Sequence, residues 1–457
     1  MKRKSIINLF LFILITITFT LSYYKNIFHV VGPESFEDAY DMYCQSQVLG
    51  RVIQGEKEGI LSEAGLNGWV RDDSIMKDMT WEEVCKFQYE IYKEEIKMGT
   101  TQFIIYDSQV GGQALFFAFL NKISPFSHTA NLNLFWIITS LSMALLISAF
   151  VFWVSKIYGS IASMITFLFL LFSPMLTMLG NDLYVVLSSF YFPFITMLLL
   201  FYYESLGRIN ISAIKLFFIS VVLISIKLFF SGFEFISTAL VMFTVPMFYY
   251  VFLNRWKLKL FIQRFTSIIL GSLSAIALYA ILYAYQLSTL KGSLIWGFEN
   301  MLSCFFRRTN GNSADFPEAF KASLDANLMD VLNMYLKSPA LGFENYVYLT
   351  FKLLIFILII LSVLSFVPKK ISPSVFKNRK INIVLIITTW ISLLAPLSWF
   401  IIFKAHAYVH YYGYDDIVWC MPFALFVFAM IGSLSSSIIK DIYDFLTSIF
   451  KSKNIFF

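Results

Sequence analysis

The chain has 457 residues, of which 58% are hydrophobic and only 14% are charged, and its mean hydropathy is +0.71. This composition excludes a water-soluble globular domain and is typical of a polytopic membrane protein. The formal net charge of +6 does not indicate a nucleic-acid-binding protein, because the basic residues are spread over short connections between apolar segments.

Ten apolar segments are near the ~20 residues that a helix needs to cross a bilayer. The ten predicted spans are residues 6–24, 131–154, 159–179, 184–203, 212–230, 234–253, 265–286, 346–367, 381–403 and 417–434. The first resembles a signal peptide, but no small-x-small cleavage site follows it, so we interpret it as an uncleaved span. The prediction is an all-α polytopic membrane protein with one integral membrane domain over residues 1–457.

The charges of the short connections predict the orientation of these spans. If the N-terminus is cytoplasmic, the cytoplasmic connections carry Lys and Arg, whereas almost all acidic residues fall outside. The positive-inside rule therefore predicts cytoplasmic N- and C-termini. It also places three segments outside, namely residues 25–130, 287–345 and 404–416, so any chemistry is expected on the extracytoplasmic face.

The first outer segment opens with an acidic stretch, Pro33 to Asp41, about ten residues after the first span. At ~100° per residue of helix, Glu34, Glu37, Asp38 and Asp41 share one face and apolar side chains share the other. We predict a juxtamembrane helix whose carboxylates face outward. One interpretation is a general base for an attacking hydroxyl. The other is that acids early in a helix favour its dipole and that the outward face is merely solvated.

Four further residues of the outer hairpins and loops stand out. Cys44 and Cys85 share the first outer segment, where an oxidising compartment would favour a disulfide, although two buried thiols are the alternative. Asp107 lies beside a pair of glycines where this segment returns to the membrane, and its role is left open. Asp182 occupies a tight outer hairpin, either as ordinary turn chemistry or as a second carboxylate of the same site.

Ionisable residues close to the spans are a default sign of function. Lys227 and Glu234 flank the fifth-to-sixth hairpin, where they either pair with each other or reach toward the outer surface. Arg307 and Arg308 follow a run of apolar residues in the second outer segment. This pair either clamps a phosphate in bidentate fashion or is a solvated pair at the membrane interface.

A basic cluster closes the ninth span. His406 and His410 are four residues apart, on one helical face, with Lys404 and Tyr408 beside them. Such a group is compatible with three roles: a lipid-phosphate site, a polar belt with an aromatic girdle, or a zinc site. Zinc is the weakest of these hypotheses, because the intervening Glu of the metalloprotease motif is missing.

The arrangement as a whole resembles the GT-C superfamily of membrane glycosyltransferases. The shared features are one span with a cytoplasmic N-terminus, a large outer loop that starts with an acidic juxtamembrane helix, an acid in the second outer loop, and later outer loops rich in Arg, Lys, His and aromatic residues. About ten spans without a soluble tail look like the bacterial O-antigen-modifying glucosyltransferases. The resemblance implies a base in the first outer loop, which we carry over to Glu37, Asp38 and Asp41 only.

The function expected from this resemblance is transfer of a sugar from an undecaprenyl-phosphate-linked donor to a cell-envelope glycan or lipid acceptor, on the outer face of the bacterial inner membrane. We expect Lys404, His406, His410, Arg307 and Arg308 to hold the leaving phosphate. Asp182, Asp107 and Tyr408 are candidate substrate contacts. No cofactor is required, and a divalent cation is left open. The alternatives are a glycan polymerase or flippase of the same pathway, or a polytopic transporter.

Overall fold

A computed structural model describes residues 2–33, 36, 42–94, 96, 99, 101–344, 346–364, 379–410 and 415–453. Most of the predicted acidic helix lies outside these residues. Glu34, Glu37, Asp38 and Asp41 are not among the described positions, so the helix and the three candidate bases stay predictions.

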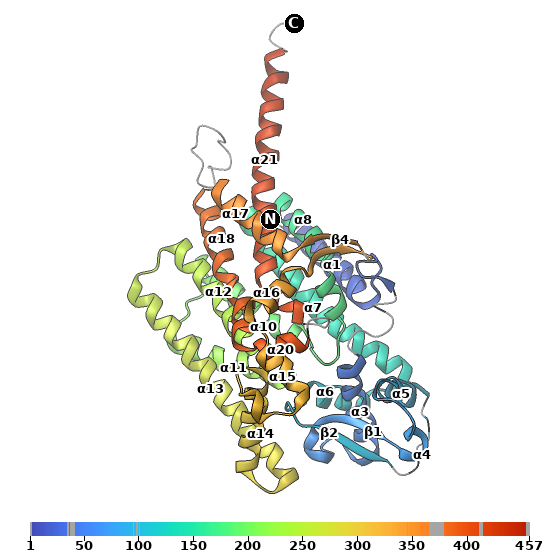
Figure 1. The fold of residues 1–457 in the computed structure, drawn as a ribbon. Coiled ribbons are helices and arrows are strands. Elements are labelled where there is room, and N and C mark those ends of the chain that lie inside the picture. Colours follow the sequence, from blue (N-terminus) through green and yellow to red (C-terminus); the bar gives the residue numbers. More distant parts are fainter. Residues whose placement is uncertain are drawn as a thin grey trace.

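Helices dominate the described part of the chain (Figure 1). Seven of them are long and apolar enough to cross a membrane, which confirms a polytopic, mainly helical membrane protein. They are α1 (Lys2–Lys25), α7 (His128–Tyr158), α11 (Ala213–Ser231), α12 (Ile236–Asn254), α13 (Leu258–Lys291), α18 (Arg379–Ser392) continued by α19 (Leu394–Ile402), and α21 (Phe423–Lys453).

The other three predicted spans are not among these seven helices, so the count of ten is not confirmed. Residues 159–179 form a short apolar helix α8 (Ser160–Leu171) and a separate α9 (Pro174–Leu179), because Pro174 begins a new helix. Residues 184–203 correspond largely to α10 (Ser188–Ser205). The predicted span 346–367 begins as strand β4 (Tyr346–Thr350), in which aromatic and β-branched residues favour extended backbone, and only then becomes α17 (Phe351–Leu364).

The predicted outer segments are folded rather than open loops. The first contains α3 (Met42–Glu58), η1 (Ser62–Gly65), β1 (Asn67–Arg71), α4 (Asp73–Met76), α5 (Trp81–Glu94), β2 (Gln102–Tyr106) and α6 (Gly112–Ile123). The second contains α14 (Leu294–Arg308), η2 (Ser313–Asp315), α15 (Glu318–Asp325), α16 (Leu328–Leu336) and β3 (Pro339–Phe343). The third contains α20 (Lys404–Val409) and η3 (Asp415–Cys420).

Four short strands are present in addition to the helices, so the described part of the chain is mainly helical rather than all-α. β1 pairs antiparallel with β2, from Asn67 opposite Tyr106 to Arg71 opposite Gln102. β3 pairs antiparallel with β4 in a separate hairpin. Cys44 and Cys85 are buried and are present as thiols, which is one of the two alternatives that the sequence left open.

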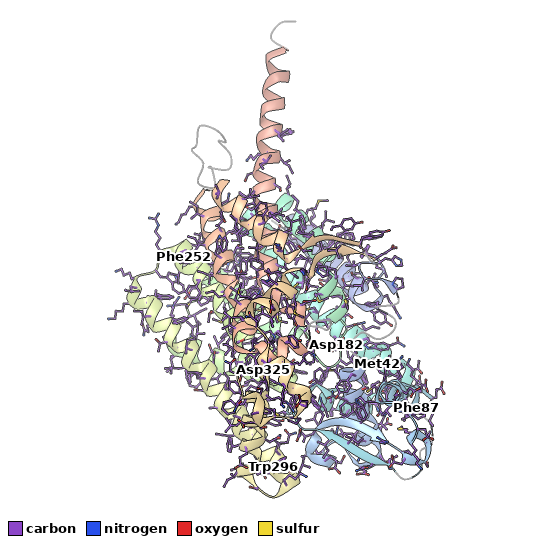
Figure 2. The ribbon with its side chains drawn as sticks, viewed as in Figure 1. Met42, Phe87, Asp182, Phe252, Trp296 and Asp325 are labelled. Atoms are coloured by element: carbon purple, nitrogen blue, oxygen red, sulfur yellow. The ribbon has the colours of Figure 1, made fainter. Side chains whose placement is uncertain are left out.

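Helix α5 of the first outer segment and helix α14 of the second lie at the same end of the molecule (Figure 1). Figure 2 shows Phe87 of α5 and Trp296 of α14 at that end, with Phe252 of α12 nearer the other end, beyond which α21 projects. Near Phe252 in sequence, Arg264 of α13 forms a bidentate ion pair with Glu204 of α10, with both N···O distances 2.7 Å.

Candidate functional site

The turn between α11 and α12 is held by a buried lysine. The Lys227 Nζ donates to the main-chain oxygens of Gly232 and Glu234, at 2.7 and 2.5 Å. Gly232 has a φ of 50°, a conformation that a residue without Cβ adopts at little cost. The predicted pairing of Lys227 with Glu234 is therefore made to the main chain of Glu234, which leaves its carboxylate available to other partners.

The carboxylate of Glu234 lies between Arg308 and His406. Its Oε1 is 3.2 Å from Nη1 of Arg308, and its Oε2 is 3.4 Å from Nε2 of His406. The contact between Glu234 and His406 is close, but the two atoms are too poorly aligned to count as a hydrogen bond. The ring of His410 is 4.4 Å from the ring of His406, centroid to centroid. We call Glu234, Arg308, His406 and His410 the Glu234 cluster.

Three elements that are far apart in the sequence build this cluster. Arg308 is the last residue of α14, Glu234 belongs to the α11–α12 turn, and the two histidines lie on α20 and at its C-terminal cap. The expectation that His406 and His410 lie side by side is confirmed. Arg308 and His406 approach the same carboxylate, that of Glu234, whose central position was not foreseen.

Burial and mutual charge set the protonation of the cluster. Burial by itself would raise the pKa of Glu234, but the guanidinium of Arg308 and the contact with His406 hold that pKa well below its usual range. Burial lowers the pKa of His406, and burial together with the neighbouring His406 lowers the pKa of His410 to about 3. At neutral pH the cluster thus consists of one guanidinium, one carboxylate and two neutral imidazoles.

A buried tryptophan and aspartate support the histidines from behind. The ring of Trp399 meets that of His406 edge to face at 5.6 Å, and its Nε1 donates to Oδ2 of Asp415 at 2.9 Å. Burial raises the pKa of Asp415 well above its usual range. Trp399 is only 1% exposed, so its ring is enclosed by the protein.

An apolar cavity of about 530 Å³ opens beside the cluster. Its walls come from α12, α13, α14 and the end of α19, and include Leu240, Ile276, Met301 and Phe403. Arg308 is the only charged side chain among the described residues that line it. A single cation in an apolar wall suits a ligand with a long hydrocarbon part and an anionic head.

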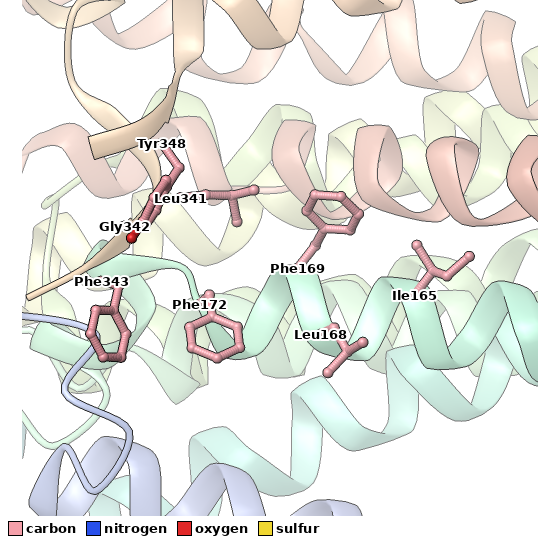
Figure 3. A pocket seen from close by; sticks show the side chains of 8 residues that line it. All are labelled: Ile165, Leu168, Phe169, Phe172, Leu341, Gly342, Phe343 and Tyr348. Carbon is pink, nitrogen blue, oxygen red and sulfur yellow. The ribbon is translucent and has the colours of Figure 1, made fainter. Parts of the chain in front are cut away.

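A second, slightly larger cavity of about 560 Å³ has a different character. Figure 3 shows its lining, which consists of side chains from α8 together with residues of β3 and β4: Ile165, Leu168, Phe169, Phe172, Leu341, Gly342, Phe343 and Tyr348. None of these described residues is charged. The larger cavity thus offers no partner to an anion, and the cavity beside Arg308 is the better candidate site.

The remaining predicted phosphate ligands have other partners. The guanidinium of Arg307 lies 5.0 Å from the ring centre of Phe320, and Nη2 of Arg307 is 3.9 Å from Sγ of Cys304. The ammonium of Lys404 donates to the carbonyl of Leu324, at 2.9 Å, near the C-terminus of α15. Both cations therefore brace α15 in this structure, and only Arg308 belongs to both the cluster and the cavity wall.

The predicted substrate contacts are dispersed. The carbonyl of Asp107 accepts hydrogen bonds from the Tyr283 hydroxyl and, at 3.3 Å, from Nδ2 of Asn300, so the first outer segment is joined to α13 and α14 next to the cavity. Tyr408 is 37% exposed. Its role stays a prediction.

Asp182 is 1% exposed and caps its own turn, with Oδ1 accepting from the main-chain nitrogens of Tyr184 at 2.7 Å and Val185 at 2.6 Å. Burial raises the pKa of this carboxyl to about 7. The geometry is that of an Asx turn, the ordinary alternative given above.

Sequence reasoning missed Glu234 as the centre of the site and Asn300 as a link to the first outer segment. The signal for Glu234 was present, because an acid at an outer hairpin tip beside a buried lysine is rare in an apolar chain. Within the part of the chain that the structure describes, no group of three His, Cys, Asp or Glu side chains is placed to hold a metal ion. The hypothesis of a zinc site on His406 and His410 therefore finds no third ligand there.

Comparisons of this chain with protein-family models, with curated proteins and with solved structures found no match.

Proposed function

We propose that this protein is a membrane glycosyltransferase. It transfers a sugar from an undecaprenyl-phosphate-linked donor to a cell-envelope glycan or lipid acceptor, at the extracytoplasmic face of the bacterial inner membrane. The observation that carries the proposal is the position of Arg308, a guanidinium that is the one charged group among the described lining residues of an apolar cavity, next to His406 and His410.

The donor fits these features part by part. Its phosphate is an anion that a guanidinium recognises in bidentate fashion, and its prenyl chain is hydrocarbon that the cavity can remove from water. Two of the helices that line the cavity, α12 and α13, are long and apolar enough to lie in the membrane, which suits entry of a hydrocarbon chain from the lipid phase. A soluble sugar nucleotide would leave the apolar walls without a role.

The reaction would break the bond between the anomeric carbon of the sugar and the phosphate oxygen, and form a bond from that carbon to an acceptor hydroxyl. The hydroxyl proton passes to a carboxylate, for which Glu37, Asp38 and Asp41 are the candidates, and prenyl phosphate leaves. Arg308 offsets the charge that develops on the leaving phosphate. This chemistry does not require a metal ion, because phosphate is already a good leaving group.

Every donor of this class gives the same product, so binding of a prenyl phosphate tests the proposal without knowledge of the sugar. We suggest titrating the purified protein in lipid nanodiscs with farnesyl phosphate, comparing wild type with Arg308→Gln and Arg307→Gln. Loss of a charge-assisted hydrogen bond should weaken binding to Arg308→Gln about 10- to 100-fold. Arg307→Gln, which removes the adjacent cation, should change it less than about threefold.

Transfer of labelled sugar from undecaprenyl-phosphate hexoses in the same nanodiscs would then test the reaction itself. Absence of farnesyl phosphate binding to the wild type, or equal weakening by both arginine variants, would contradict the proposed site.

A further inference from the structure

Within the Glu234 cluster, the guanidinium that would hold the phosphate already has a carboxylate partner. The Arg308 side chain is 13% exposed and that of Glu234 is 8% exposed, so the 3.2 Å ion pair between them is shielded from water. Because His406 and His410 are neutral at pH 7, the charges of the cluster sum to zero. A phosphate that binds Arg308 therefore meets a negative charge on the same guanidinium.

The donor and the product of the proposed reaction differ in charge. A prenyl-phosphate sugar is a phosphodiester with one negative charge. The prenyl phosphate that leaves is a monoester, which carries about −1.5 to −2 at pH 7 because its second pKa is near 6. A fixed carboxylate in a shielded site repels the second charge in addition to the first, so its effect is larger on the product than on the donor.

We infer that Glu234 determines the charge selectivity of this site, favouring the singly charged donor over the doubly charged product and so promoting product release. This inference rests on the proposed function. Glu234 is a selectivity-determining residue and takes no part in bond making or breaking.

The main chain around Glu234 suits this role. Lys227 holds the Gly232 and Glu234 carbonyls, so the position of the turn does not depend on the ligand. When the site is empty, the carboxylate also neutralises Arg308, which would otherwise be an unpaired buried charge. A neutral side chain at this position would leave the guanidinium free to bind the most highly charged anion most tightly.

The test compares two ligands with the same chain and different charge, farnesyl phosphate and farnesyl methyl phosphate. At pH 7.5 we expect the wild type in nanodiscs to bind the diester at least as tightly as the monoester. In Glu234→Gln the order should reverse, with the monoester bound about tenfold or more tighter than by the wild type and the diester changed by a smaller factor. Glu204→Gln is the matched control, because it removes a carboxylate that is paired with Arg264 outside the Glu234 cluster. This substitution should leave both affinities unchanged.

A measurement on the unaltered protein keeps the test valid if Glu234→Gln does not fold. Between pH 7.5 and pH 5 farnesyl phosphate loses most of its second charge and the diester does not change, whereas Glu234 keeps its charge because its pKa is held well below its usual range. A change of charge at His406 acts on both ligands, so the measured quantity is the affinity of the monoester divided by that of the diester at each pH. The monoester affinity should therefore rise toward that of the diester at pH 5.

Weaker binding of both ligands to Glu234→Gln, or an equal change for both, would overturn the inference. Glu234 would then serve only to position the side chain of Arg308. In that case the proposed function would stand, because the wild type would still bind both ligands. If the wild type binds neither, the proposed function fails and the inference fails with it.

Discussion

Arg308 and Glu234 tie the amphipathic helix α14 to the turn between α11 and α12 through an ion pair of 3.2 Å. Arg308 also lines the apolar cavity. The ion pair therefore positions helix α14, which forms one wall of the cavity, and it places a charged group at the edge of that cavity. Removing one partner of such a shielded pair typically costs 3–5 kcal/mol, since the other charge is left buried and alone. The pair is thus a structural and a chemical feature at once.

The candidate bases are tested by three separate amide variants, Glu37→Gln, Asp38→Asn and Asp41→Asn. Loss of a general base typically lowers a rate about 10²- to 10⁴-fold, so the variant of the true base should lose sugar transfer to that extent. Its affinity for farnesyl phosphate should change less than about twofold. Transfer of labelled sugar in nanodiscs provides the rate, and Glu34→Gln is the control from the same stretch. Full activity in all three variants would remove the base from the first outer segment.

The cavity beside Arg308 is tested by filling it. Ala280 of α13 lines it, and Ala280→Trp would occupy space that the prenyl chain needs. In the wild type, farnesyl phosphate should bind much more tightly than dimethylallyl phosphate, because each buried methylene contributes ~0.8 kcal/mol. Ala280→Trp should lose most of this dependence on chain length. Leu278→Trp, at a position of the same helix that is 48% exposed, is the control and should retain it.

The long spans and part of the site could be predicted from the sequence, but for two different physical reasons. Helices such as α7 and α12 follow from apolar runs whose length matches a bilayer, a local property. The convergence of Arg308 with His406 follows from topology, since both belong to segments on the same predicted face. The contact of each with Glu234 depends on the packing of α11, α12 and α14, which no local pattern encodes.

The errors also have physical causes. Residues 346–350 contain aromatic and aliphatic side chains and run without a break into the more apolar helix α17, so a window of hydropathy includes strand β4 in the span. The pairing of β4 with strand β3 shows that these residues are extended. Arg307 was grouped with Arg308, and Lys404 with His406 and His410, by proximity in sequence. Adjacent residues of a helix point in directions about 100° apart, and Arg307 accordingly faces Phe320 rather than Glu234.

Asp182 predicts a dependence of stability on pH. Burial raises its pKa to about 7 from an unfolded value of 3.8, so between about pH 4 and pH 7 the folded protein binds the extra proton. The contribution of this group to stability is therefore greatest below pH 4 and is lost as the pH rises through 7. Asp182→Asn keeps an oxygen that accepts from Tyr184 and Val185 but never acquires the charge.

The melting temperature of Asp182→Asn in detergent should consequently exceed that of the wild type by several degrees at pH 8 and equal it at pH 4. The exposed Asp330, replaced by Asn, serves as the control and should show no such crossover. A lower melting temperature of Asp182→Asn at both pH values would mean that the ionised carboxylate stabilises the turn.

The contacts of Lys227 also constrain how the chain enters the membrane during synthesis. A lysine disfavours insertion of an apolar helix, and the ammonium of Lys227 is satisfied by carbonyls that belong to the residues after α11. Those carbonyls are in position only once the following turn has formed. Helices α11 and α12 are therefore expected to leave the translocation machinery together, as a helical hairpin, rather than one after the other.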